Sequence, residues 1–427
     1  MKKIYNPEKK TWKEILKRPS QRIEDLEDIV LQVFEEVREE GDEAVQWYTK
    51  KFDGADLDKI LVSKSEIKEA KVGLNDSLKK AIQLAKKNIE SFHAAQRTEK
   101  LEVSTAEGVD CWQEKRPIQK VGLYIPGGTA PLFSTILMLA IPASIAGCQE
   151  IVLCSPPDAN GDIHPAILYT ANLCGVTKIV KVGGIQAIAG MTFGTESIPQ
   201  VYKIFGPGNQ YVTVAKQLAT KFGVAIDMPA GPSELLVVAD DTANSAFVAS
   251  DLLSQAEHGK DSQVILVSTS KALIDKVEVE IEKQIEALPR KEMAQAAIEN
   301  SKLIYVENNQ IALDLINEYG PEHFIVCVED EDFYTDRIAN AGSVFIGNYT
   351  PESAGDYASG TNHTLPTNGY AKQYSGVNLD SFLKSMTFQK ISAQGIQNIG
   401  KEIELMADAE GLQAHKNAVT LRLKSLE

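Results

Sequence analysis

The stretch KVGLYIPGG at residues 120–128 decides the fold of this 427-residue chain. Its apolar run predicts a short buried strand, Pro-Gly-Gly predicts a tight turn, and the apolar residues from Leu132 predict a buried helix. The same order recurs at 178–193 and again from residue 202, each time around a glycine-rich turn. Repeated strand, turn and helix predict a parallel sheet with these turns at the carboxyl ends of its strands, where nucleotides usually bind.

The glycine turns alone support a nucleotide cofactor only weakly, because none of them has the G-x-G-x-x-G dinucleotide pattern. Backbone N–H groups can nevertheless hold phosphates without positive side chains. The formal net charge of -15, with no basic block, argues against binding to a nucleic-acid backbone.

Further apolar runs at 233–239, 262–268, 303–306 and 324–328 predict a second α/β sheet. We expect two Rossmann-like parallel-sheet domains, one inserted in the other, with N- and C-terminal helical extensions. The expected divisions are an N-terminal arm at 1–20, a discontinuous α/β domain at 21–123 and 235–377, an inserted domain at 124–234 and a C-terminal helical segment at 378–427.

The cysteines and the N-terminus indicate a cytoplasmic protein. The five cysteines are an odd number without closely spaced pairs, which favours reduced and mostly buried thiols. The basic residues at the N-terminus are not followed by an apolar core, so no secretion signal is expected. The apolar run at 132–147 is too short and too interrupted to span a membrane.

The sequence LLSQAEHG at 252–259 places Gln255 and His258 three positions apart, which brings both to one face of a helix. An amide oxygen and an imidazole form an incomplete ligand set for zinc, and Asp356 and His415 could complete four nitrogen and oxygen ligands. The alternatives are a helix-capping role for Gln255, a surface position for His258 and a turn position for Asp356.

Glu322 and His323 follow a Gly-Pro turn just before an apolar strand, a place where a rigid scaffold presents acid–base groups. A solvated loop pair is the alternative. Glu410 and His415 fall in a pattern typical of an amphipathic helix and could be surface residues, although Gly411 suits a helix interior poorly.

These motifs together resemble the histidinol dehydrogenase family over roughly residues 20–422. The matching segments, in chain order, are 121–128 (VGLYIPGG), 183–187 (GGIQA), 206–209 (GPGN), 229–234 (PAGPSE), 252–259, 320–323 (GPEH), 355–357 (GDY), 362–363 (NH) and 409–415 (AEGLQAH).

The resemblance implies a zinc-dependent, NAD-linked oxidation of L-histidinol to L-histidine through L-histidinaldehyde. Two NAD molecules are consumed in this last step of histidine biosynthesis. It assigns NAD to the inserted domain, zinc and catalysis to the discontinuous domain, and dimerisation to the C-terminal segment. It further implies a homodimer in which residues of the partner subunit complete each site.

The resemblance also implies the role of each site residue. The zinc ligands are Gln255, His258, Asp356 and His415, and the acid–base pair is Glu322 and His323. The substrate contacts are Ser233, Glu410, His323 and the four metal ligands. The NAD contacts are Tyr124, Gln186 and Asn209. His363 is expected to line the site, and His415 and Glu410 to reach the site of the partner subunit.

Two positions depart from the family pattern, and two other functions stay open. Lys260 and Thr361 stand where proline is common, which affects loop rigidity and not the ligands. A zinc hydrolase in which Glu322 activates metal-bound water predicts activity without NAD. A non-catalytic metal-binding assembly protein predicts zinc-dependent dimerisation without turnover. The glycine turns and the paired acid and base favour the dehydrogenase over both.

Overall fold

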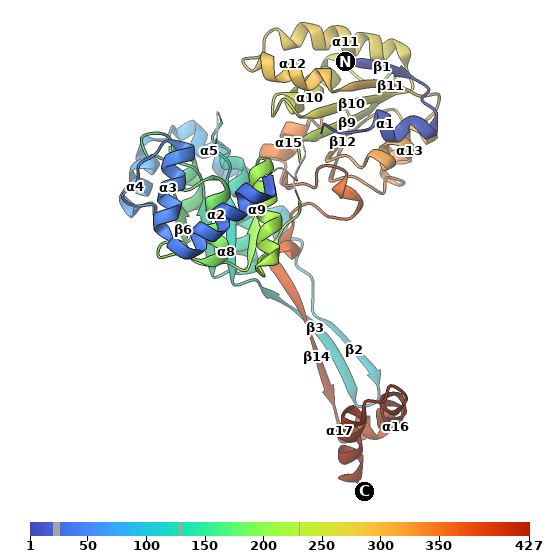
Figure 1. Cartoon of the computed structure of the whole chain (residues 1–427). Coiled ribbons are helices and arrows are strands. Elements are labelled where there is room, and N and C mark those ends of the chain that lie inside the picture. Colours follow the sequence, from blue (N-terminus) through green and yellow to red (C-terminus); the bar gives the residue numbers. More distant parts are fainter. Residues whose placement is uncertain (20–25, 128–129, 230) are drawn as a thin grey trace.

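The computed structural model describes residues 1–19, 26–127, 130–229 and 231–427. It consists of two α/β domains and a long arm that projects from them (Figure 1). Three sequence predictions fall partly outside the described residues: the last glycine of the turn at 126–128, the start of the first long helix at residue 23, and Ala230 in the segment 229–234.

The first domain contains the parallel sheet predicted from the glycine turns. Its strands lie in the order β6 (Lys178–Val180), β5 (Glu150–Cys154), β4 (Lys120–Tyr124), β7 (Lys203–Phe205) and β8 (Ala225–Ile226). The helices that follow these strands are α6 (Phe133–Ala146), α7 (Pro165–Leu173), α8 (Gly184–Phe193) and α9 (Gln210–Lys221). Residues 134–143 of α6 are all buried, which explains its continuous apolar sequence and confirms a core helix.

The helices between residues 27 and 94 pack on this first domain, which differs from the expected division at residue 123. Helices α2 (Glu27–Glu40) and α3 (Asp42–Asp53) contact α8, while α4 (Lys64–Gly73) contacts α7 and α5 (Asp76–Ala94) contacts α6. The apolar face of α2, with Val30, Val33 and Phe34, shares one core with residues of α8. Periodicity identifies such a face but not the sheet that it covers.

The second domain is a six-stranded parallel sheet. The order is β1 (Lys2–Tyr5), β11 (Lys302–Tyr305), β10 (Gln263–Ser268), β9 (Glu234–Ala239), β12 (His323–Cys327) and β13 (Ser343–Ile346). Around it lie α1 (Trp12–Ile15), α10 (Ser245–Ala256), α11 (Lys271–Ile285), α12 (Lys291–Glu299), α13 (Asn309–Tyr319), α14 (Glu331–Thr335) and α15 (Glu352–Tyr357). Because β1 precedes the first domain and β9 follows it, one domain is inserted in the other, as predicted.

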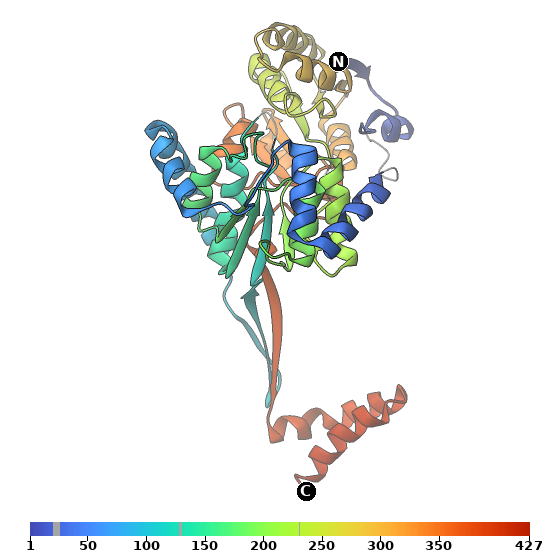
Figure 2. The ribbon, with the colours of Figure 1, turned by 60° about the vertical axis from the view of Figure 1, so that its left-hand side comes forward.

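The projecting arm is a three-stranded antiparallel ribbon tipped by two helices (Figures 1 and 2). Strand β3 (Val109–Pro117) lies between β2 (Leu101–Ala106) and β14 (Leu383–Ile391), and α16 (Ala393–Ala409) and α17 (Gln413–Lys424) follow. The C-terminal segment was expected to be helical throughout, and β14 corrects this. It pairs with β3 along its whole length, from Leu383 opposite Pro117 to Ile391 opposite Val109. Within the described residues, no helix has both the length and the apolar character needed to cross a membrane.

Candidate active site

Glu322 and His323 lie at the amino end of β12 and are buried, with 6% and 4% exposure, so the solvated-loop alternative is wrong. The backbone of Glu234, at the start of the adjacent strand β9, holds both. Its N–H donates to Glu322 Oε2 at 2.8 Å, and its carbonyl oxygen lies 3.2 Å from His323 Nδ1. His323 Nε2 is buried and has no hydrogen-bond partner among the described residues.

Three carboxylates surround the His323 ring. Nδ1 lies 3.7 Å from Glu322 and 3.9 Å from Glu352, and Nε2 lies 3.8 Å from Asp356. Burial by itself lowers the pKa of His323, but the charges of Glu352, Glu322 and Asp356 outweigh it and raise the pKa to about 10. For the carboxyl group of Glu352, burial acts in the opposite direction and raises the pKa to about 8. Acidic groups collected in this way attract a cation.

A possible metal site adjoins the imidazole. One ligand atom each from His258, Glu352 and Asp356 lies within 4.8 Å of the others. Nitrogen and carboxylate donors at this separation suit zinc. Glu352 was not among the predicted ligands. Its spacing of four from Asp356 was the available signal, since residues so spaced share one face of a helix, here α15.

Gln255 and His258 approach this cluster from the end of α10. The helix ends at Ala256, so His258 lies beyond it and not on its face, and its N–H donates to the Gln255 carbonyl at 3.3 Å. Gln255 is buried, and its amide nitrogen, in the orientation that satisfies both groups, donates to Glu352 Oε2 at 3.0 Å. In this orientation the amide nitrogen faces Glu352, and turning the amide over would instead point its oxygen at the candidate donors.

His415 and Glu410 do not join the cluster within one chain. Glu410 ends α16, Gly411 breaks the helix with φ +73°, and His415 lies in the first turns of α17. Helix α16 packs on α17 and contacts β14 and β2 at the far end of the arm (Figure 2). The predicted ligand set is therefore incomplete in a single subunit.

Ser233 and His363, two further predicted site residues, belong to segments near Glu322 and His323. Ser233 precedes β9, and its carbonyl oxygen accepts from Gln263 N at 3.1 Å. The Nε2 atom of His363 is buried without a partner in the described part of the chain, and burial lowers the pKa of this imidazole. Its neighbour Asn362 donates to the Met138 carbonyl at 2.7 Å, which ties this loop to α6 of the other domain.

The predicted NAD contacts lie on the three glycine turns of the first sheet. Tyr124 ends β4 and its hydroxyl accepts from Gly184 N at 3.1 Å, and Asn209 caps α9 by accepting from Val212 N at 3.1 Å. At Gly206, with φ +124°, a Cβ atom would lie 2.1 Å from the Tyr124 carbonyl oxygen, so only glycine fits.

Gln186 is the strongest sign of a ligand at these turns. Its side chain is fully buried in the first turn of α8, yet both its amide oxygen and its amide nitrogen lack partners among the described residues. Buried polar groups are normally hydrogen-bonded, and an amide in this position can serve the polar groups of a bound dinucleotide. The residues present therefore fit NAD.

Two parallel-sheet domains, glycine turns and a buried acid–imidazole cluster with metal-type donors define an α/β oxidoreductase. The family model for histidinol dehydrogenase matches residues 16–423. The chain belongs to the histidinol dehydrogenase family, as the motifs predicted, and the family implies NAD use.

Relatives match over the whole chain. The histidinol dehydrogenase of Bacteroides thetaiotaomicron is 60% identical over 427 residues, covering 100% of both chains. That of Bacteroides fragilis is 59% identical over 426 residues, again covering 100% of both. The crystal structure of histidinol dehydrogenase from Elizabethkingia anophelis superposes with a TM-score of 0.98 at 59% identity, covering 100% of this chain and 98% of that one. This close match confirms the predicted fold class.

Proposed function

We propose that this protein oxidises L-histidinol to L-histidine through L-histidinaldehyde, with two NAD molecules used in succession and zinc in the site. The observation that carries the proposal is the buried pair of Glu322 and His323 beside the donors His258, Glu352 and Asp356. Membership in the family supplies the substrate, and the unpartnered amide of Gln186 supports a dinucleotide on the glycine turns.

In the first step His323 accepts the alcohol proton through Nε2, which has no other partner among the described residues. NAD supplies the hydride acceptor for each oxidation. A metal cation bound beside Glu352 and Asp356 would offset the charges that raise the pKa of His323. The contact of Nδ1 with the Glu234 carbonyl then favours the neutral tautomer with a proton on Nδ1 and a free lone pair on Nε2.

In the second step Glu322 takes a proton from a water that attacks the aldehyde carbon, while His323 returns its proton to the aldehyde oxygen to give the gem-diol. The gem-diol then gives up the second hydride and passes a hydroxyl proton to His323, which leaves the acid. Bound zinc would hold the substrate's imidazole and amine and cancel part of the negative charge of Glu352 and Asp356. The candidate holders on this chain are Gln255, His258, Glu352 and Asp356. Gln255 and Glu352 are buried, Asp356 is half-buried and His258 is exposed, and a substrate held among them would stay beside His323 through both oxidations.

The site is further proposed to be shared by two subunits of a homodimer, with the partner's His415 and the partner's Glu410 completing it. Glu410 ends α16 and His415 lies in α17, and these helices lie at the tip of the arm, away from α15 (Figure 1). Its helices also expose apolar side chains, including Leu405 at 63%, Met406 at 67% and Leu421 at 59%, which suit burial against another subunit.

The first experiment measures NADH formed per L-histidinol consumed by the purified zinc-loaded protein. We expect about two NADH per histidine, with activity abolished by a chelator and restored by zinc. Turnover without NAD would favour the zinc hydrolase instead. Zinc-dependent dimerisation without any turnover would favour the assembly protein.

Mixing two inactive variants tests the shared site. His323→Ala and His415→Ala fail in different parts of a shared site, so a heterodimer of the two carries one intact site. Random mixing makes half of the dimers heterodimers, each with one of two sites intact, so activity should recover to about a quarter of the wild-type value. No recovery, with heterodimers present by native mass spectrometry, would place His415 in its own subunit's site or outside any site.

A further inference from the structure

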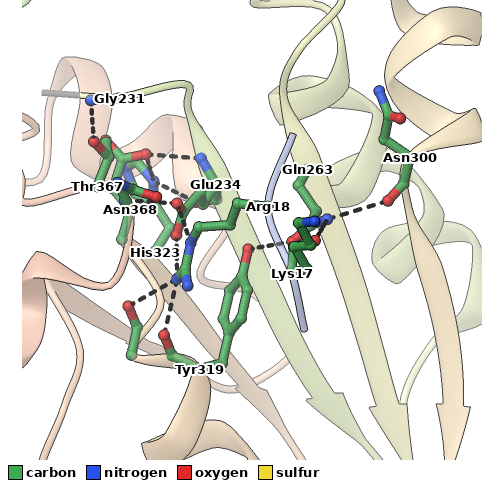
Figure 3. Close-up of polar contacts among 12 residues, drawn as sticks. Lys17, Arg18, Gly231, Glu234, Gln263, Asn300, Tyr319, His323, Thr367 and Asn368 are labelled. Atoms are coloured by element: carbon green, nitrogen blue, oxygen red, sulfur yellow. Dashed lines mark hydrogen bonds and ion pairs between the residues drawn. The ribbon is translucent and has the colours of Figure 1, made fainter. Parts of the chain in front are cut away.

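Arg18, in the N-terminal segment that follows α1, forms a buried ion pair with Glu234. Its Nε donates to Glu234 Oε1 at 2.5 Å and its Nη2 to Oε2 at 2.8 Å, with side-chain exposures of 15% and 2% (Figure 3). A two-pronged contact of this kind fixes the carboxylate in direction as well as position, which a single charge cannot do.

Several further contacts hold the guanidinium in place. Arg18 Nη2 also donates to the Tyr319 carbonyl at 2.8 Å, and the guanidinium lies 3.9 Å from the centroid of the Tyr319 ring. The Tyr319 hydroxyl donates to Gln263 Oε1 at 3.0 Å, and Gln263 Nε2 donates back to the Lys17 carbonyl at 3.1 Å (Figure 3). The terminal segment is thus held by contacts with β9, β10 and α13 of the second domain, which together form a ring.

Glu234 connects this ring to the acid–base pair through its backbone. Its N–H holds Glu322 and its carbonyl oxygen faces His323 Nδ1, while its own Oε1 accepts from Asn368 N at 2.6 Å. Burial raises the pKa of Glu234, and Arg18 opposes this. Without the guanidinium, the carboxylate would be buried beside Glu322 with no cation, and it would have to shift or take up a proton.

We infer that Arg18 is a positioning residue for the reaction, which sets Glu322 and His323 through the side chain and backbone of Glu234. The inference rests on the roles proposed above for Glu322 and His323. Strand β1 pairs with β11 of the second sheet, and the segment after it brings Arg18 to the amino end of β9.

A substitution at Lys3 tests whether the terminal segment has only a structural role. Lys3 attaches the same segment to α11 through Asp275 at 2.7 Å and Glu278 at 2.6 Å, on the surface and without contact to Glu234. Lys3→Met therefore weakens attachment of the segment and leaves the Arg18–Glu234 pair intact, which makes it the matched control.

The experiment compares Arg18→Met, Arg18→Lys and Lys3→Met with the wild type, recording kcat, KM for histidinol, zinc content and thermal unfolding. We expect Arg18→Met to lower kcat about ten- to a hundredfold, with KM and zinc content little changed because Arg18 touches neither substrate ligands nor metal donors. Arg18→Lys should recover part of kcat, since lysine restores the charge but not the two-pronged contact. Lys3→Met should retain the wild-type kcat.

Equal kcat values for Arg18→Met and the wild type, or equal losses in Arg18→Met and Lys3→Met, would overturn the inference. If Arg18→Met does not fold, Arg18→Lys and Glu234→Gln take its place: the double variant should be no slower than the slower single variant, because both act through one pair. Multiplying losses would overturn the inference as well. A wild-type protein inactive on histidinol would instead refute the proposed function.

Discussion

Replacing Lys216 by methionine should destabilise the first domain by several kcal/mol. Lys216 in α9 and Asp227 after β8 form an ion pair at 2.5 Å, and each side chain is only 2% exposed. The pair also satisfies both backbone groups of Gly206: Lys216 Nζ donates to its carbonyl at 2.7 Å, and Asp227 Oδ2 accepts from its N–H at 2.8 Å. The third glycine turn is therefore attached to the core through these two side chains.

The expected loss follows from what Lys216→Met leaves behind. Methionine retains much of the volume, so little cavity forms, but Asp227 becomes a buried carboxylate without a cation and the Gly206 carbonyl loses its donor. Breaking a buried pair in this way costs about 3–5 kcal/mol. In the double variant with Asp227→Asn no charge is left uncompensated, and the loss should shrink to less than about 2 kcal/mol.

Urea unfolding followed by far-UV circular dichroism measures both losses, with Lys221→Met as the control. Lys221 is an exposed lysine of the same helix, and its replacement should change the free energy of unfolding by less than about 0.5 kcal/mol. Lys216→Met should also raise KM for NAD, since the turn that bears Asn209 shifts. A loss below about 1 kcal/mol, or a double variant no more stable than Lys216→Met, would refute this account of the pair.

Three further outcomes are expected. Glu322→Gln should impair oxidation of the aldehyde more than the first hydride transfer, since only the aldehyde step needs activated water; stopped-flow NADH traces from histidinol and histidinaldehyde compare the two, and equal defects would count against the role. Glu352→Gln should lower zinc content by direct metal analysis, because it removes a charged donor, and unchanged content would exclude Glu352 from the ligands. Burial raises the pKa of four cysteine thiols to about 12, namely those of Cys148, Cys154, Cys174 and Cys327. A thiol reagent at pH 8 should therefore label none of them in the folded protein, and labelling of any of them, detected by mass spectrometry, would contradict their burial.

The residues of local segments were sufficient to predict the strands, the glycine turns and several parts of the site. The repeated order of strand, glycine turn and helix at residues 120–128, 178–193 and from 202 onward predicted the parallel sheet. This was possible because strand and helix periodicity and turn chemistry are properties of neighbouring residues. The same locality placed Glu322 and His323 directly before a strand. Their burial was not predictable, since it depends on what packs over them.

Contacts between distant segments were decided only by the tertiary structure. The sequence of an amphipathic helix such as α2 predicts an apolar face but not the sheet that this face covers. The sequence of β14 was predicted to be helical, and it forms a strand because it pairs with β3. Glu352 lies beside His258 and Asp356, and Arg18 pairs with Glu234, which is 216 positions away, because the second domain folds these distant segments together. Sequence patterns report the preferences of neighbouring residues, whereas the site is made by side chains that the folded backbone brings together from far apart in the chain.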